Sequence, residues 1–203
     1  MLVFIGCTSN KTKQTLPFIN QPDFTPEWIQ ADDTAYKNMH TIPAFSFYNQ
    51  DGKIVTEKTV EGKIYVANFI FTRCASICPV MTSNMMILQQ KFKDDEAVIF
   101  LSHSVTPDLD DVSVLKKYAN LKGIISGKWH LLTGNQADIY RIAKKEYFAG
   151  DTIGFYQAND AFLHTENFIL VDKKRRIRGV YNGTLAIEMD RLIIDIETLK
   201  EEE

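Results

Sequence analysis

The sequence predicts an α/β domain with a central mixed sheet flanked by helices and an N-terminal β-hairpin. Apolar runs of strand length alternate with segments of helical periodicity, and patterns typical of β-hairpins stand near both ends of this alternation. Such alternation is typical of a sheet whose faces are covered by helices. The 203 residues suffice for one domain with a substantial core, expected at 42–200 after an extended, proline-containing lead-in at 1–41.

The strands are predicted from apolar runs and turn residues. Two short runs flank a turn that contains Gly52, which predicts the N-terminal hairpin. The nearly continuous apolar run at 64–71 is typical of a strand buried on both faces. The expected strands span 45–48, 53–56, 64–71, 97–101, 129–132, 168–171 and 178–181.

The helices are predicted from apolar residues that recur every three or four positions. Met81, Met85 and Met86 have the spacing of a buried helical face, so we expect these methionines in the core rather than at a metal site. Asp110 and Asp111 are acidic residues of the kind that precede a helix. The expected helices span 80–93, a segment after 111, 137–147 and 185–199.

Composition excludes several classes of function. A net charge of -3 and an isoelectric point near 5.8 do not indicate a positively charged surface for nucleic acid, so no nucleic-acid partner is expected. The local basic run Lys173–Arg176 lies between the two strands of the last hairpin and is interpreted as a solvated turn. No apolar stretch of the chain is long enough to span a membrane.

Cys74 and Cys78 are the most informative residues. They stand four apart where the strand at 64–71 meets a helix, and Pro79 is tolerated in a first helical turn. Two thiols at that place can form a disulfide, exchange one, or bind a soft metal ion. The spacing predicts that both side chains lie on one face of the first helical turn. A cysteine pair at the end of the first buried strand makes a thioredoxin-like fold the natural expectation.

A metal site needs a third ligand, for which the chain offers four histidines. His164 precedes the strand that begins near 167, which such a sheet brings beside the cysteine loop, and His103 is its competitor. His130 lies inside a strand, and nothing favours His40. Two thiolates and an imidazole suit Cu(I), and also hold Cu(II) or Zn(II).

The cysteine motif with Pro79, together with the late His164 segment, resembles the Sco/SenC family over about residues 42–199. The resemblance implies a thioredoxin-like fold and a copper chaperone that helps metallate the dinuclear copper centre of cytochrome c oxidase. It implies Cys74, Cys78 and His164 as copper ligands. The chain departs from the family pattern between the cysteines, where Ala75 and Ser76 replace a frequent Pro-Asp, and at Thr106, where aspartate is common.

Cys7 follows a short apolar stretch and precedes a polar tract, the pattern at the end of a bacterial lipoprotein signal. We therefore expect a lipid on Cys7 that anchors the protein in the bacterial cell envelope, facing the periplasm or the outside of the cytoplasmic membrane. The alternative is an unmodified N-terminal cysteine of a soluble protein.

Two functions compete for the cysteine pair. The first is copper binding for oxidase assembly, with the copper-centre subunit and a thiol–disulfide reductant as partners. The second is thiol–disulfide exchange through the redox-active pair Cys74 and Cys78, without obligatory copper. A peroxiredoxin-like peroxidase shares the Thr72-Arg73-Cys74 element but leaves Cys78 and His164 unexplained. A metallochaperone is favoured over an enzyme.

Overall fold

A computed structural model describes residues 15–150 and 165–202. Its centre is a seven-stranded mixed sheet in the order β4-β3-β7-β6-β5-β8-β9. β5, β6 and β7 are parallel, and the outer strands are antiparallel to their neighbours. This sheet and the hairpin β3-β4 confirm the predicted fold class. The strands are β3 (Ser46–Asn49), β4 (Ile54–Thr56), β5 (Ile64–Ile70), β6 (Val98–Ser104), β7 (Trp129–Thr133), β8 (Asn167–Val171) and β9 (Ile177–Asn182).

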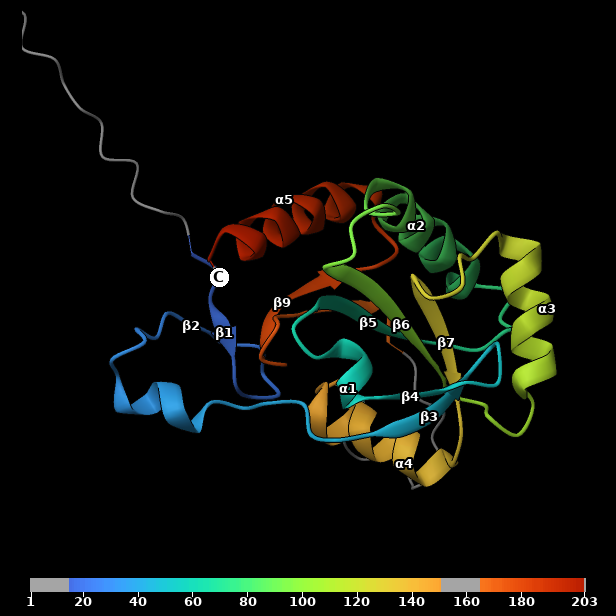
Figure 1. Cartoon of the computed structure of the whole chain (residues 1–203), viewed down its shortest axis with the longest axis horizontal. Coiled ribbons are helices and arrows are strands. Elements are labelled where there is room, and N and C mark those ends of the chain that lie inside the picture. The colour runs from blue at the N-terminus through green and yellow to red at the C-terminus, as the bar shows by residue number, and fades with distance from the viewer. Residues whose placement is uncertain (1–14, 151–164, 203) are drawn as a thin grey trace, which may run out of the picture.

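Helices cover both faces of the sheet, with α2 and α5 together above it and α4 below it in Figure 1. α2 begins three residues before the expected position 80, and the segment after α4 continues as a π-helical turn rather than an α-helix. The helices are α1 (Glu57–Val60), α2 (Ile77–Lys91), α3 (Val112–Lys122), α4 (Gln136–Arg141), the π-helical turn η2 (Ile142–Glu146) and α5 (Ala186–Glu202).

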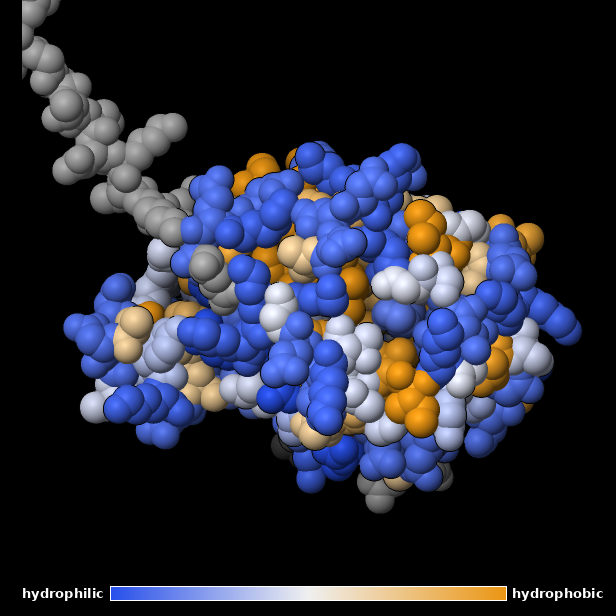
Figure 2. Space-filling model, in the orientation of Figure 1, coloured by the Kyte–Doolittle hydropathy of each residue, from blue (hydrophilic) through white to orange (hydrophobic). Residues whose placement is uncertain are grey.

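Alternation along the strands divides the core into two layers, one on each face of the sheet. On β5, Tyr65 and Phe69 pack into the layer that also contains residues of α4 and η2. Val66 packs into the opposite layer, with the inner faces of α2, α3 and α5. Met81 and Met85 are fully buried in this second layer, as predicted, whereas Met86 is only partly buried against it. The exterior is mostly hydrophilic on the face in Figure 2, with hydrophobic side chains in small groups.

The described part of the lead-in packs against the domain. It contains β1 (Phe18–Ile19), β2 (Pro26–Glu27) and the 3-10 helix η1 (Thr34–Asn38), and Phe18 is buried. Arg178 of β9 donates to the carbonyl oxygen of Leu16 at 2.6 Å and to Glu202 of α5 at 2.7 Å. Residue 15 therefore lies close to the end of α5 (Figure 1).

The basic run is a turn, as expected, but only part of it is solvated. Asp172 accepts hydrogen bonds from the backbone N–H groups of Lys174 and Arg176, both at 2.9 Å, and so fixes the turn between β8 and β9. The Arg176 side chain is buried and forms an ion pair with Asp172 at 2.7 Å. Over residues 15–150 and 165–202, no helix is long and apolar enough to cross a bilayer.

Candidate metal and redox site

Both cysteines of the pair lie where β5 leads into α2, and both are free thiols. Cys78 is the second residue of α2 and is only 5 % exposed, within the core layer beneath that helix. Cys74 is half-buried and precedes the helix by three residues. The expected placement of both side chains on one helical turn is therefore wrong. The bent loop at 71–76 brings the sulfurs together instead, and they share a hydrogen bond.

The N-terminus of α2 has no side-chain cap and lies next to Cys74. Ser76, at the N-cap position, makes no side-chain capping hydrogen bond, so the first backbone N–H groups of the helix are available to another acceptor. The backbone N–H groups of Cys78, Ser76 and Ile77 interact with the Cys74 sulfur. A sulfur at the positive end of a helix is stabilised as a thiolate.

The pKa values of the two thiols are shifted in opposite directions. Partial burial opposes ionisation of Cys74, but the backbone hydrogen bonds from Cys78 and Ser76 outweigh it and bring its pKa below the ordinary value of 9.0. Burial raises the pKa of Cys78 to about 11, and the nearby charges of Cys74 and Asp110 act in the same direction. As the pH rises, Cys74 therefore ionises before Cys78 and is expected to be the attacking thiol.

The Asp110 side chain holds the start of the cysteine loop to the end of β6 through hydrogen bonds. Its carboxylate is fully buried and accepts from the Thr72 hydroxyl at 2.5 Å and from the Thr72 backbone N–H at 3.2 Å. It also accepts from the hydroxyls of Ser104 at 2.6 Å and Thr106 at 3.1 Å. Four donors thus replace the water that a buried carboxylate loses.

The sequence did not distinguish Asp110 from Asp111, although their roles differ. Asp111 is the N-cap of α3 and accepts from the backbone N–H of Val114 at 2.8 Å. Asp110 instead connects the ends of β5 and β6. Thr106 donates to Asp110, which an aspartate at position 106 cannot do when ionised. The available signal was the set of hydroxyl residues that follow both strands.

His103 does not reach the cysteine pair. It is fully buried in β6, with ring centroids 5.2 Å from Phe69 and 5.5 Å from Tyr147, in the core layer opposite Cys78. His130 is buried, and its Nδ1 lies 3.1 Å from Asn49 Nδ2. His40 Nε2 lies 2.7 Å from the carbonyl oxygen of Glu146. The described contacts of His103, His130 and His40 are therefore structural, and none of them is with the cysteine pair.

His164 and Cys7 lie outside the described residues. The register of the sheet bears on the neighbourhood of His164, because β8 pairs antiparallel with β5 and sets Ala67 opposite Ile169. β8 therefore begins beside the end of β5 from which the cysteine loop leaves. Among residues 15–150 and 165–202, no three side chains of histidine, cysteine, aspartate or glutamate gather as a metal site.

His103 gives the domain a predicted acid sensitivity. Burial lowers its pKa from 6.5 to about 4, so the folded protein resists protonation while the unfolded chain accepts a proton. The free energy of unfolding should fall by about 3 kcal/mol between pH 6.5 and pH 4, a loss that is absent above pH 6.5. We expect His103→Leu to flatten this part of the stability–pH curve, as measured by urea unfolding. A variant curve parallel to the wild-type curve would contradict the assignment.

The sheet order, the helices on both faces and the cysteine pair at the start of α2 define a thioredoxin-like dithiol protein. The chain belongs to the SCO1/SenC family, whose model matches residues 33–201. The SCO1 protein homolog of Bacillus subtilis is 34% identical over 161 residues, which cover 78% of this chain and 82% of the relative.

Three solved structures show the same fold. A SCO1/SenC family lipoprotein from Bacillus anthracis has 34% identity and a TM-score of 0.70, covering 79% of this chain and 95% of that one. BsSco, described as a cytochrome c oxidase assembly protein with a disulfide switch, has 32% identity and a TM-score of 0.68, covering 81% and 95%. ScoI of Arabidopsis thaliana with copper bound has 25% identity and a TM-score of 0.60, covering 76% and 97%.

Proposed function

We propose that this protein binds copper through Cys74, Cys78 and His164 and serves in the assembly of cytochrome c oxidase. In that role it delivers copper to the dinuclear copper centre or prepares the thiols of that centre. The observation that carries the proposal is the pair of free, adjacent thiols at the open start of α2. Membership of the SCO1/SenC family and the copper-bound Arabidopsis relative support it.

The chemistry of the two described donors fits copper. Thiolate sulfur is a soft ligand that favours Cu(I), and an imidazole nitrogen as third ligand suits both oxidation states. Cys74 is half-buried, so an ion bound there is accessible for transfer to a partner. Metal binding must displace the proton of Cys78, whose raised pKa makes binding weaken as the pH falls.

His164→Ala should abolish tight copper binding and leave disulfide formation between Cys74 and Cys78 intact. An imidazole ligand is needed for the metal, whereas dithiol oxidation needs only the two sulfurs. Anaerobic titration with Cu(I) and Cu(II), followed by absorption of the thiolate-to-copper charge-transfer band, measures the first property. Alkylation of free thiols after mild oxidation measures the second.

His40→Ala is the matched control, because His40 is a histidine of the lead-in with a backbone partner on η2. It should bind copper with the wild-type stoichiometry and spectrum. Unchanged tight binding by His164→Ala would overturn the assignment of His164 as a ligand. Loss of binding in both histidine variants would show that the effect comes from the fold rather than from the ligand.

Thiol–disulfide exchange is a second candidate, favoured by the unequal acidities of the thiols. The Cys74 thiolate would attack a sulfur of the partner's disulfide, forming a mixed disulfide and releasing one partner thiolate. Cys78 would then lose its proton and attack Cys74 Sγ, releasing the second partner thiolate. The partner is reduced and the pair oxidised, and a thiol reductant must restore it.

We also propose that a lipid on Cys7 anchors the protein in the bacterial cell envelope, outside the cytoplasm. The apolar stretch and polar tract around Cys7 support this, and the Bacillus anthracis relative is described as a lipoprotein. The eight residue-to-residue steps from Cys7 to Thr15 span at most roughly 28 Å, so the domain would stay close to the membrane. Retention of the wild-type protein, but not of Cys7→Ala, in the membrane fraction tests the anchor.

A further inference from the structure

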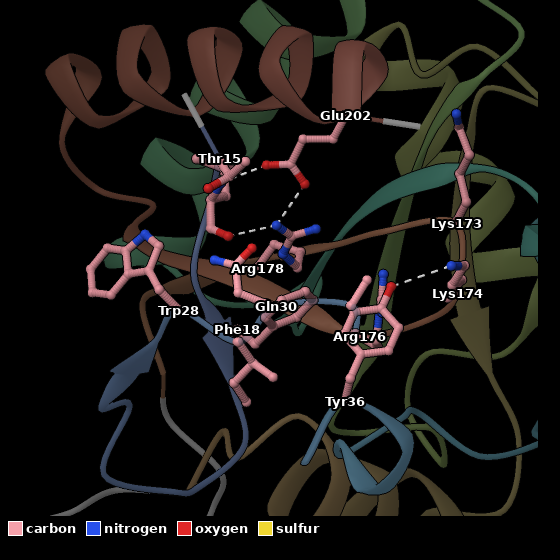
Figure 3. A pocket seen from close by; sticks show the side chains of 13 residues that line it. Thr15, Phe18, Trp28, Gln30, Tyr36, Lys173, Lys174, Arg176, Arg178 and Glu202 are labelled. Carbon is pink, nitrogen blue, oxygen red and sulfur yellow. Dashed lines mark hydrogen bonds and ion pairs between the residues drawn. The ribbon is translucent and has the colours of Figure 1, made fainter. Parts of the chain in front are cut away.

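A pocket of about 540 Å³ is lined by the turn between β8 and β9, which lies beside the start of β5, whereas the cysteine loop follows the end of β5. Its walls come from the lead-in, the turn between β8 and β9, and the end of α5 (Figure 3). The charged side chains that line it are Lys173, Lys174, Arg176, Arg178 and Glu202.

Positive charge predominates in this pocket, although the whole chain has a net charge of -3. Asp172, beneath the turn, and Glu202 offset the two arginines. Lys174 is exposed, and the described partner of its side chain is Tyr36, whose hydroxyl accepts from Nζ at 3.3 Å (Figure 3). Hydrogen bonds from Arg176 and Lys174 lower the pKa of Tyr36, as a positive environment should.

The floor of the pocket is held rigidly. The Arg178 guanidinium donates to the carbonyl oxygens of Leu16 and Pro17 and lies 4.1 Å from the centre of the Phe18 ring. The Arg176 guanidinium lies 4.9 Å from the centre of the Tyr36 ring. These arginines are already held in place, so binding an anion does not have to order them. The exposed Lys174, for whose ammonium group the structure describes no carboxylate partner, supplies the positive charge that is not offset.

We propose that this pocket binds a phosphate group. Phosphate offers several charged oxygens that can meet donors from different directions, whereas a carboxylate offers two in one plane. Tyr36 adds a hydroxyl donor, and Trp28, which is 63 % exposed at the rim, adds an apolar surface for the rest of a ligand. The phosphate belongs either to a small soluble molecule or to a phospholipid headgroup. The proposal is independent of copper binding.

The test is titration of the folded protein with inorganic phosphate at constant ionic strength, followed by calorimetry and by backbone amide shifts in NMR. We expect saturable binding that shifts the amides of the β8–β9 turn. Lys174→Gln should weaken binding about tenfold or more, because a hydrogen bond to a charged group is lost. Lys144→Gln is the matched control, since Lys144 is an exposed lysine 5.7 Å from the Tyr140 ring and outside the pocket.

A second arm distinguishes the sources of the phosphate. Cosedimentation with phosphatidylglycerol vesicles, using wild type and Lys174→Gln, detects a headgroup site, and phosphatidylcholine vesicles provide the neutral reference. Binding of both probes, or of either one alone, with loss in Lys174→Gln supports the pocket. The proposal is overturned if neither probe binds, if Lys174→Gln and Lys144→Gln behave alike, or if acetate competes as well as phosphate.

Discussion

In the Cys78→Ser variant, a mixed disulfide through Cys74 should accumulate when the protein meets a small disulfide reagent. Cys74 has the lowered pKa and partial exposure of an attacking thiol, and the variant lacks the thiol that would resolve the adduct. Cys74→Ser should react at least about tenfold more slowly, because the raised pKa of Cys78 leaves little thiolate and burial hinders access. Mass spectrometry of the adducts over time measures both rates.

Cys74→Ser and Cys78→Ser should both also lose tight copper binding. Their equal loss of copper and unequal loss of thiol reactivity would show that the metal needs both sulfurs while exchange begins at one. Equal reactivity of Cys74→Ser and Cys78→Ser toward the disulfide reagent would contradict the acidities assigned here.

Asp110→Ala should lower the free energy of unfolding by about 3 kcal/mol or more. The change leaves the hydroxyls of Thr72, Ser104 and Thr106 without their buried acceptor. Asp110→Asn retains the shape but removes the charge, so it should recover part of the stability and lower the pKa of Cys78. Urea unfolding measures stability, and the pH dependence of alkylation measures the thiol pKa.

Asp111→Asn provides the matched control for both Asp110 variants. Its side chain caps α3, and asparagine caps a helix about as well as aspartate. We expect stability within about 1 kcal/mol of wild type and an unchanged pKa of Cys78. An Asp110→Ala variant as stable as this control would refute the anchoring role. An Asp110→Asn variant with an unchanged Cys78 pKa would refute the electrostatic one.

Much of the fold could be predicted because its elements have strong local signals. The run at 64–71 is nearly all apolar and became β5, an interior strand between β6 and β8. α1 was missed because four residues carry no periodicity, and its signal is the capping box of Thr56 and Thr59. β1 and β2 were missed because two residues each are too few to show a pattern.

The site was predictable only where it has a local sequence signal. The spacing of Cys74 and Cys78 identified the pair, but not the bent loop that separates Cys74 from α2. The role of Asp110 depends on two loops that meet in space, which no local pattern reveals. His103 was a reasonable competitor by position. Its side chain belongs to the other face of the sheet, because alternation along β6 places it there.

X-ray absorption at the copper edge of the copper-loaded protein tests the central claim most directly. The account predicts two sulfur donors and at least one imidazole nitrogen per copper in the wild type, with the nitrogen contribution lost in His164→Ala. A coordination shell of nitrogen and oxygen alone, or one sulfur per copper, would contradict copper binding by Cys74 and Cys78. An imidazole contribution that persists in His164→Ala would contradict the third ligand.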